Sequence, residues 1–122
     1  MAWKFQSGRA ISEQIADRLR SDIISGRYKM GEQFPTVRSL AEEAGVNPNT
    51  VQKSLTLLEN EGLIRAQSTV GRVVTDDGEA INAAGRRILE SRLSGFVSEM
   101  KELGISKDEL IDYIRKGWDS NV

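Results

Sequence analysis

The sequence predicts a mostly α-helical chain that carries one small β-hairpin. Three observations indicate this fold class. Apolar residues recur at helical spacing over most of the 122 residues. Two helices follow one another across a short glycine turn within residues 36–60, and the two short strands of a valine-rich hairpin follow within residues 63–75. We therefore predict a winged helix-turn-helix domain over residues 1–75 and a short two-helix region over residues 76–122.

Composition indicates a folded chain and argues against an enzyme. Hydrophobic residues make up 39% of the chain and charged residues 29%. No apolar run approaches the roughly 20 residues of a membrane span, and no secretory signal peptide opens the chain. Cysteine is absent, which fits a reducing cytoplasm. Histidine is absent too, which removes the usual general base and the commonest transition-metal ligand. We expect a cytoplasmic protein that is not an enzyme and has no metal or cofactor.

The formal net charge of −1 does not by itself suggest a nucleic-acid partner. Its distribution has the right sign but is small: residues 1–75 carry a net charge of +2, and residues 76–122 carry −3. Affinity for DNA depends on cations placed at phosphates and not on their total. The local pattern of residues therefore has to support any claim of DNA binding.

The first helix is indicated by isoleucine and leucine residues spaced four apart from residue 11 to residue 23, and Gly26 ends it. Ahead of it, Trp3 and Phe5 are expected to pack back on the domain, although a mobile arm is the alternative. After it, the short segment Gln33-Phe34 is expected to form a single strand that pairs with the later hairpin.

The second and third helices have clear start and stop signals. Thr36 is a hydroxyl N-cap candidate for the second helix, and Gly45 closes it. Asn47 is a strong N-cap for the third helix, and Pro48 suits its first position because proline lacks only an amide that would have no partner there. Several polar residues near this start can hydrogen-bond bases or phosphates: Asn47, Asn49, Thr50, Gln52 and Lys53.

A hairpin follows the third helix, which ends at Glu61-Gly62. Residues 63–66 and 72–75 are predicted as its two strands, and residues 67–71 as the turn between them. Helix, turn, helix and hairpin in this order form a winged helix.

The string FPTVRSLAEEAGVNPNTVQKSLTLLENEGLI over residues 34–64 closely resembles the GntR family of bacterial transcriptional regulators. The VNPNTVQ heptad and the short C-terminal part resemble its YtrA-type subfamily. The match covers residues 8–75 strongly, and the remainder by length and helical character only. The resemblance implies a sequence-specific regulator of transcription, and specifically a repressor, that binds a near-palindromic double-stranded DNA operator as a homodimer. A small-molecule effector stays unknown.

The resemblance also implies roles for particular residues. Arg38 stands where the family pattern has an arginine that contacts DNA, whereas an isolated exposed arginine would more often be solvated. Gln52 stands where many members carry arginine, which puts guanine reading there in doubt, since glutamine prefers adenine or contacts phosphate. For the polar residues of the third helix, the alternative is capping and an ordinary surface. The predicted base-facing residues are Arg38, Asn49, Thr50 and Gln52, and the predicted backbone contacts are Asn47, Lys53, Gly71 and Arg72.

The hairpin departs from the family pattern. Many YtrA-like members carry Arg-Arg-Gly-Lys-Gly-Thr in the wing, but here residues 67–72 are Gln-Ser-Thr-Val-Gly-Arg. Only Gly71 and the shifted cation Arg72 remain. We expect a weakly charged wing and a lower affinity for DNA than in relatives with basic wings.

Beyond a polar break at residues 76–79, apolar residues predict a long helix over residues 79–103. Gly85 and Gly95 within it would each cost about 1 kcal/mol unless they permit a kink or a close helix approach. Ser106 caps a final helix, in which Trp118 is expected to anchor packing rather than to contact a ligand.

Two helices cannot enclose a substantial core alone, so we expect their apolar face to meet a second copy of the chain. The alternative is a monomer in which the final helix covers that face completely. For function, the alternatives to a regulator are a winged-helix module that binds protein without DNA and, with less support, a small enzyme. The predicted dimer contacts are Ile88, Leu89, Leu93, Phe96 and Met100.

Overall fold

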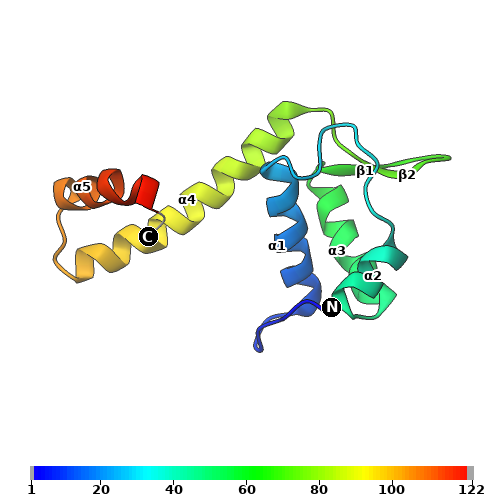
Figure 1. The fold of residues 1–122 in the computed structure, drawn as a ribbon, viewed down its shortest axis with the longest axis horizontal. Helices are drawn as coiled ribbons and strands as arrows, with labels where there is room; N and C mark the ends of the chain where they lie inside the picture. The colour runs from blue at the N-terminus through cyan, green and yellow to red at the C-terminus, as the bar shows by residue number, and fades with distance from the viewer. Residues whose placement is uncertain (1, 121–122) are drawn as a thin grey trace. The chain divides into compact units, whose positions relative to one another are not determined.

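The computed structural model describes residues 2–120 and contains the helices and the hairpin in the predicted order (Figure 1). A winged helix-turn-helix comes first, and a long and a short helix follow it. The predicted fold class is therefore confirmed. The bounds are Ile11–Ile24 for α1, Val37–Ala44 for α2, Pro48–Asn60 for α3, Ile64–Gln67 for β1, Gly71–Val74 for β2, Gly78–Glu102 for α4, Lys107–Gly117 for α5 and Trp118–Ser120 for the final 3-10 turn η1.

Local capping begins α2 and α3 where the sequence predicts. The Thr36 hydroxyl accepts a hydrogen bond from the amide of Ser39 at 3.0 Å, and the Asn47 side chain accepts one from the amide of Asn49 at 2.8 Å. Gly45 closes α2 with a left-handed φ of 74°, which glycine adopts without the steric cost that other residues meet. The two helices are thus joined by one tight turn.

The wing is an antiparallel pair in which Ile64 lies opposite Val74 and Gln67 lies opposite Gly71. A third segment joins it, as predicted. Gln33 bridges to Val73, and the amide of Phe34 donates to the carbonyl of Arg72 at 2.7 Å. These backbone bonds fasten the root of the wing to the segment that enters α2.

The core of the winged domain is closed. Ile15 and Leu19 of α1 and Leu55 of α3 are fully buried, and Phe34 is 2% exposed. Trp3 and Phe5 pack against this cluster, which confirms the expectation that the N-terminal segment folds back on the domain. The structure therefore provides a rigid base for the helix-turn-helix.

Chain contacts divide the protein into two compact units, one that runs up to Gly85 and one that begins at Arg86. The first turns of α4 belong to the first unit, because Ala84 is buried and Ile81 packs against the core. A Cβ on Gly85 would lie 3.4 Å from Cγ2 of Ile24, so glycine permits this close approach. The division thus falls later in the chain than the polar break at residues 76–79.

The second unit contains the rest of α4 and all of α5. Ser106 caps α5 by accepting a hydrogen bond from the amide of Glu109 at 3.2 Å, as predicted. Within residues 2–120, no residue after Ala84 is buried. Trp118, expected to anchor packing, is 78% exposed in the single chain because nothing in this unit covers it. None of the described helices is both long and apolar enough to span a membrane.

Candidate nucleic-acid interface

The start of α3 combines a buried apolar face with an exposed polar one. Val51 and Leu55 are fully buried, and the Ser54 hydroxyl donates to the carbonyl of Ser12 at 2.7 Å. These contacts fix the rotation of α3 about its axis and leave its other face open. Of the predicted residues on this helix, Thr50 is half-buried, and four are exposed: Asn47, Asn49, Gln52 and Lys53.

This exposed end has the electrostatic character that a phosphate needs. The first amides of a helix lack intrahelical partners, and the macrodipole makes the N-terminus positive. Asn47 already satisfies the amide of Asn49, while Lys53 adds a full charge one turn further along. Backbone amides, carboxamides and one cation therefore occupy the exposed face of the first two turns, a combination that suits both base edges and phosphate oxygens.

Arg38 extends from the first turn of α2 into solvent. Its side chain is 90% exposed, and its Nε lies 3.6 Å from a carboxylate oxygen of Glu42, one turn later on the same helix. Exposed ion pairs of this kind contribute only about 0–1 kcal/mol. Glu42 can be displaced at little cost, so the Arg38 side chain is accessible, and its contact with DNA stays a prediction.

The two wing residues of the predicted site are placed differently. Gly71 is exposed at the start of β2, with a φ of 94° that favours glycine. Arg72 instead turns towards α3, where its Nη2 lies 3.4 Å from a carboxylate oxygen of Glu59. Its Nε is buried and has no hydrogen-bond partner. Arg72 is thus held against α3 in the free protein, with only 22% of its side chain exposed.

A second ion-pair network, which the sequence did not predict, fixes the far end of α3. Arg20 of α1 donates to both carboxylate oxygens of Glu61, at 2.7 and 2.6 Å, and its Nη1 donates to Asp17 at 2.9 Å. The hydrogen bond to Glu61 is the largest effect that raises the pKa of Arg20 above its ordinary value. The network links α1 to the C-terminus of α3.

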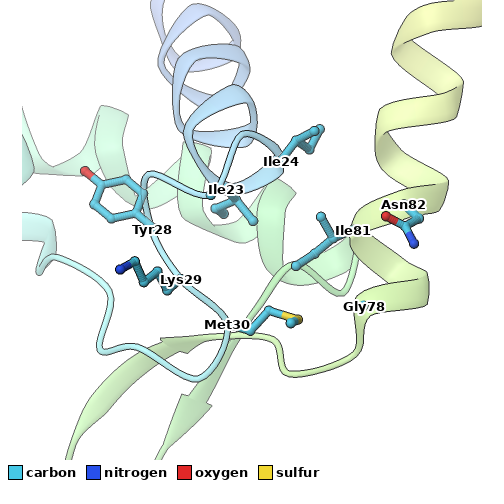
Figure 2. A pocket seen from close by; sticks show the side chains of 9 residues that line it. Ile23, Ile24, Tyr28, Lys29, Met30, Gly78, Ile81 and Asn82 are labelled. Atoms are coloured by element: carbon cyan, nitrogen blue, oxygen red, sulfur yellow. The ribbon is translucent and has the colours of Figure 1, made fainter.

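One pocket of about 420 Å³ lies on the first unit, away from the start of α3. Figure 2 shows that Ile24 of α1, Met30 of the loop after α1 and Ile81 of α4 reach it, and that the ammonium end of Lys29 points away from Ile81. Its mostly apolar lining offers few groups that could orient a polar ligand. Within residues 2–120, no cluster of acidic, histidine or cysteine side chains could hold a metal ion.

Comparison with known proteins identifies the domain. The profile of the family described as "Bacterial regulatory proteins, gntR family" matches residues 11–74, which cover both helices of the helix-turn-helix and the wing. The chain belongs to the GntR family. The resemblance predicted from residues 34–64 is therefore confirmed, and membership places this GntR protein among DNA-binding regulators of transcription and not among enzymes.

Similar chains extend the match to the C-terminal helices. This GntR protein is 31% identical to the uncharacterised HTH-type transcriptional regulator YhcF of Bacillus subtilis, over 92% of this chain and 93% of that protein. It is 27% identical to the HTH-type transcriptional repressor YtrA of the same organism, over 91% and 86% of the two chains. The structure of a GntR-family transcriptional regulator from Listeria monocytogenes covers 92% of this chain and 98% of its own, with a TM-score of 0.85 and 31% identity. The match to YtrA-like proteins of similar length is thus confirmed.

Proposed function

We propose that this GntR protein is a cytoplasmic repressor that binds a near-palindromic operator as a homodimer. The observation that carries the proposal is the exposed polar turn at the start of α3, held in place by a buried face and by the Arg20–Glu61 pair. Similarity to YtrA, which is named a repressor, supports the sign of regulation. A rigid domain that presents such a turn is suited to reading the major groove.

For the DNA contacts, we propose that one set of residues contacts bases and another contacts the sugar-phosphate backbone. Arg38, Asn49, Thr50 and Gln52 face bases, because their side chains can donate to or accept from base edges. Asn47, Lys53 and Gly71 lie against the sugar-phosphate backbone. Arg72 joins this set only after it leaves Glu59.

For the dimer, we propose that the exposed apolar side chains of the second unit meet those of another copy. Leu89, Leu93 and Phe96 are 61%, 47% and 41% exposed, whereas Ile88 and Met100 are half-buried. A two-fold dimer requires an inverted-repeat operator. In a dimer, binding of the second DNA-binding domain to its half-site becomes intramolecular, which can raise the affinity for the operator by roughly 10²- to 10⁴-fold. The weakly charged wing makes this gain necessary for useful affinity.

Selection of bound sequences from random duplex DNA, followed by titration at several salt concentrations, tests the DNA contacts. Arg38→Ala is expected to cost about 1–3 kcal/mol on the selected sequence. Lys53→Ala is expected to weaken all sequences about equally and to lower the salt slope by roughly one unit. Equal protection of the selected site by Arg38→Ala and the wild type removes Arg38 from the interface.

Gln52→Arg tests the departure from the family pattern. Arginine can bond both acceptors of guanine in the major groove, whereas glutamine matches the donor and acceptor of adenine. The variant is therefore expected to shift preference towards guanine at one position in each half-site. An unchanged position-by-position preference in competition binding assigns Gln52 to phosphate or water alone.

Analytical ultracentrifugation at micromolar concentration tests the dimer. The wild type is expected at twice the 13.5 kDa mass of the chain, and Leu93→Asp with Phe96→Asp at the single-chain mass with loss of operator binding. Ser91→Asp with Ser98→Asp is the matched control, since both serines are exposed on the opposite side of α4 and add the same charge. A monomeric wild type that binds one half-site at full affinity contradicts the dimer.

A further inference from the structure

The N-terminal arm, which we define as residues 2–6, contacts the end of α2 and the turn that leads into α3. The backbone amide of Trp3 donates to the carbonyl of Ala44 at 3.2 Å, and its indole donates to the Glu43 carboxylate at 3.2 Å. Ala2 lies so close to Gly45 that a Cβ on Gly45 would come within 2.7 Å of the Ala2 Cβ. The arm therefore touches three consecutive residues at the helix-turn-helix turn.

The same arm is fastened to α1 at two points. The guanidinium of Arg18 stacks on the Trp3 ring, 3.8 Å from the ring centroid, in the geometry of a cation–π contact. Two hydrogen bonds join Gln6 to Gln14, each 2.9 Å long. The backbone amide of Gln6 donates to Oε1 of Gln14, and Nε2 of Gln14 donates to the backbone carbonyl of Gln6. Trp3 thus links α1 to the turn, whose residue Glu43 lies 40 positions after Trp3 in sequence.

The position of the first residue of α3 is determined by this turn. Gly45 has a left-handed φ of 74°, and Asn47, two residues later, caps α3. We propose that Trp3 is a positioning residue for DNA binding: the arm holds the Gly45 turn and so places the first turn of α3 for base contact. The proposal rests on DNA binding by the helix-turn-helix and is independent of the dimer and of the sign of regulation.

Positioning affects base contacts more than phosphate contacts. Hydrogen bonds to base edges depend on direction, whereas non-specific binding depends mainly on charge near the phosphates. Loosening the turn should therefore lower the ratio of specific to non-specific affinity. A change that only destabilises the fold lowers both affinities in parallel and leaves that ratio unchanged.

The test compares Trp3→Ala, Trp3→Phe and Ile81→Ala in binding to the selected operator and to mixed duplex DNA, together with thermal unfolding. Trp3→Ala is expected to lower the affinity ratio roughly tenfold, the scale of one cation–π contact together with one hydrogen bond. Trp3→Phe keeps a ring for Arg18 and is expected to recover most of the loss. Ile81→Ala is the matched control, because Ile81 packs on the core from α4, outside the arm, and should change stability without changing the ratio.

Failure to select any operator would contradict the proposed function but not the positioning role of Trp3. Amide hydrogen exchange of the protein without DNA tests that role separately. Trp3→Ala is then expected to speed exchange at Val46 and Asn49 while leaving Leu58 protected. Glu43→Gln replaces the carboxylate that accepts the indole hydrogen bond with a neutral amide, and it should speed exchange at the same amides to a smaller extent. Unchanged exchange at the turn, or an unchanged affinity ratio in Trp3→Ala, overturns the proposal.

Discussion

The two compact units differ in how far their apolar side chains are exposed to solvent. In the first unit, Ile15, Leu19 and Leu55 are completely removed from solvent. In the second, Leu89 of α4 and Trp118 of η1 are 61% and 78% exposed. A buried leucine contributes about 1.5–3 kcal/mol relative to an exposed one. The first unit therefore contains its own source of stability, whereas the second needs another surface.

The largest expected effect comes from comparing one leucine in each unit. Leu55→Ala is expected to cost about 2–5 kcal/mol of the free energy of unfolding, because it leaves a cavity in a closed core. Leu89→Ala, made in the Leu93→Asp, Phe96→Asp background that lacks the proposed dimer contact, is expected to cost less than about 0.5 kcal/mol. Urea unfolding followed by circular dichroism measures both. Equal costs would show that the second unit has a closed core of its own in solution.

The link between α1 and α3 should have the next largest effect. Glu61→Gln removes the charge that pairs with Arg20, whose side chain is 18% exposed, and is expected to cost about 1–3 kcal/mol of unfolding free energy. Glu42→Gln is the control, because its partner Arg38 is 90% exposed, and it should leave stability nearly unchanged. If both variants unfold at the same urea concentration as the wild type, the Arg20 pair does not stabilise the domain.

The features predicted from sequence are those that short stretches encode. The caps at Thr36 and Asn47 and the turn at Gly45 join residues two to four apart, so the pattern alone locates them. The Arg20–Glu61 pair and the Trp3 contact with Ala44 join residues about forty apart and leave no local pattern.

The sequence also did not predict that the Arg72 side chain points towards α3. In β2 the residues after it, Val73 and Val74, are both buried, so alternation does not reveal the direction of its side chain. Only the fold, which brings β2 against α3, shows that Glu59 is its partner. For the same reason, apolar periodicity in α4 identified a face but not what covers it.

Acid sensitivity should be concentrated in the first unit, at Asp17. Burial acts to raise the pKa of Asp17, but hydrogen bonds from Arg9 and Arg20 outweigh it, so the pKa is lowered from its ordinary value of 3.8. A lowered pKa in the folded state stabilises the fold above the unfolded pKa, and this stability is lost as the pH falls through the folded value. Wild type should therefore lose more unfolding free energy than Asp17→Asn between about pH 5 and pH 3. Asp76→Asn, at an exposed loop position, is the control, and parallel pH profiles for all three proteins contradict the assignment.

The smallest expected effect concerns the wing. Glu59→Gln removes a negative charge from the last turn of α3 and releases Arg72, so DNA affinity is expected to rise by about 0.2–1 kcal/mol, with a steeper salt dependence. Glu79→Gln in α4 changes the net charge equally and controls for the general loss of an anion.

The double variant Glu59→Gln, Arg72→Ala separates the two possible roles of Arg72. If the released guanidinium reaches a phosphate, the double variant loses the gain of Glu59→Gln, and its salt slope falls by roughly one unit. If both variants bind DNA equally well, Arg72 never contacts the backbone, and its pairing with Glu59 serves only to fasten the wing to α3. We expect the first outcome, because the buried Nε of Arg72 has no hydrogen-bond partner in the free protein. A guanidinium with an unpaired buried donor loses less on leaving Glu59 than one whose donors are all hydrogen-bonded.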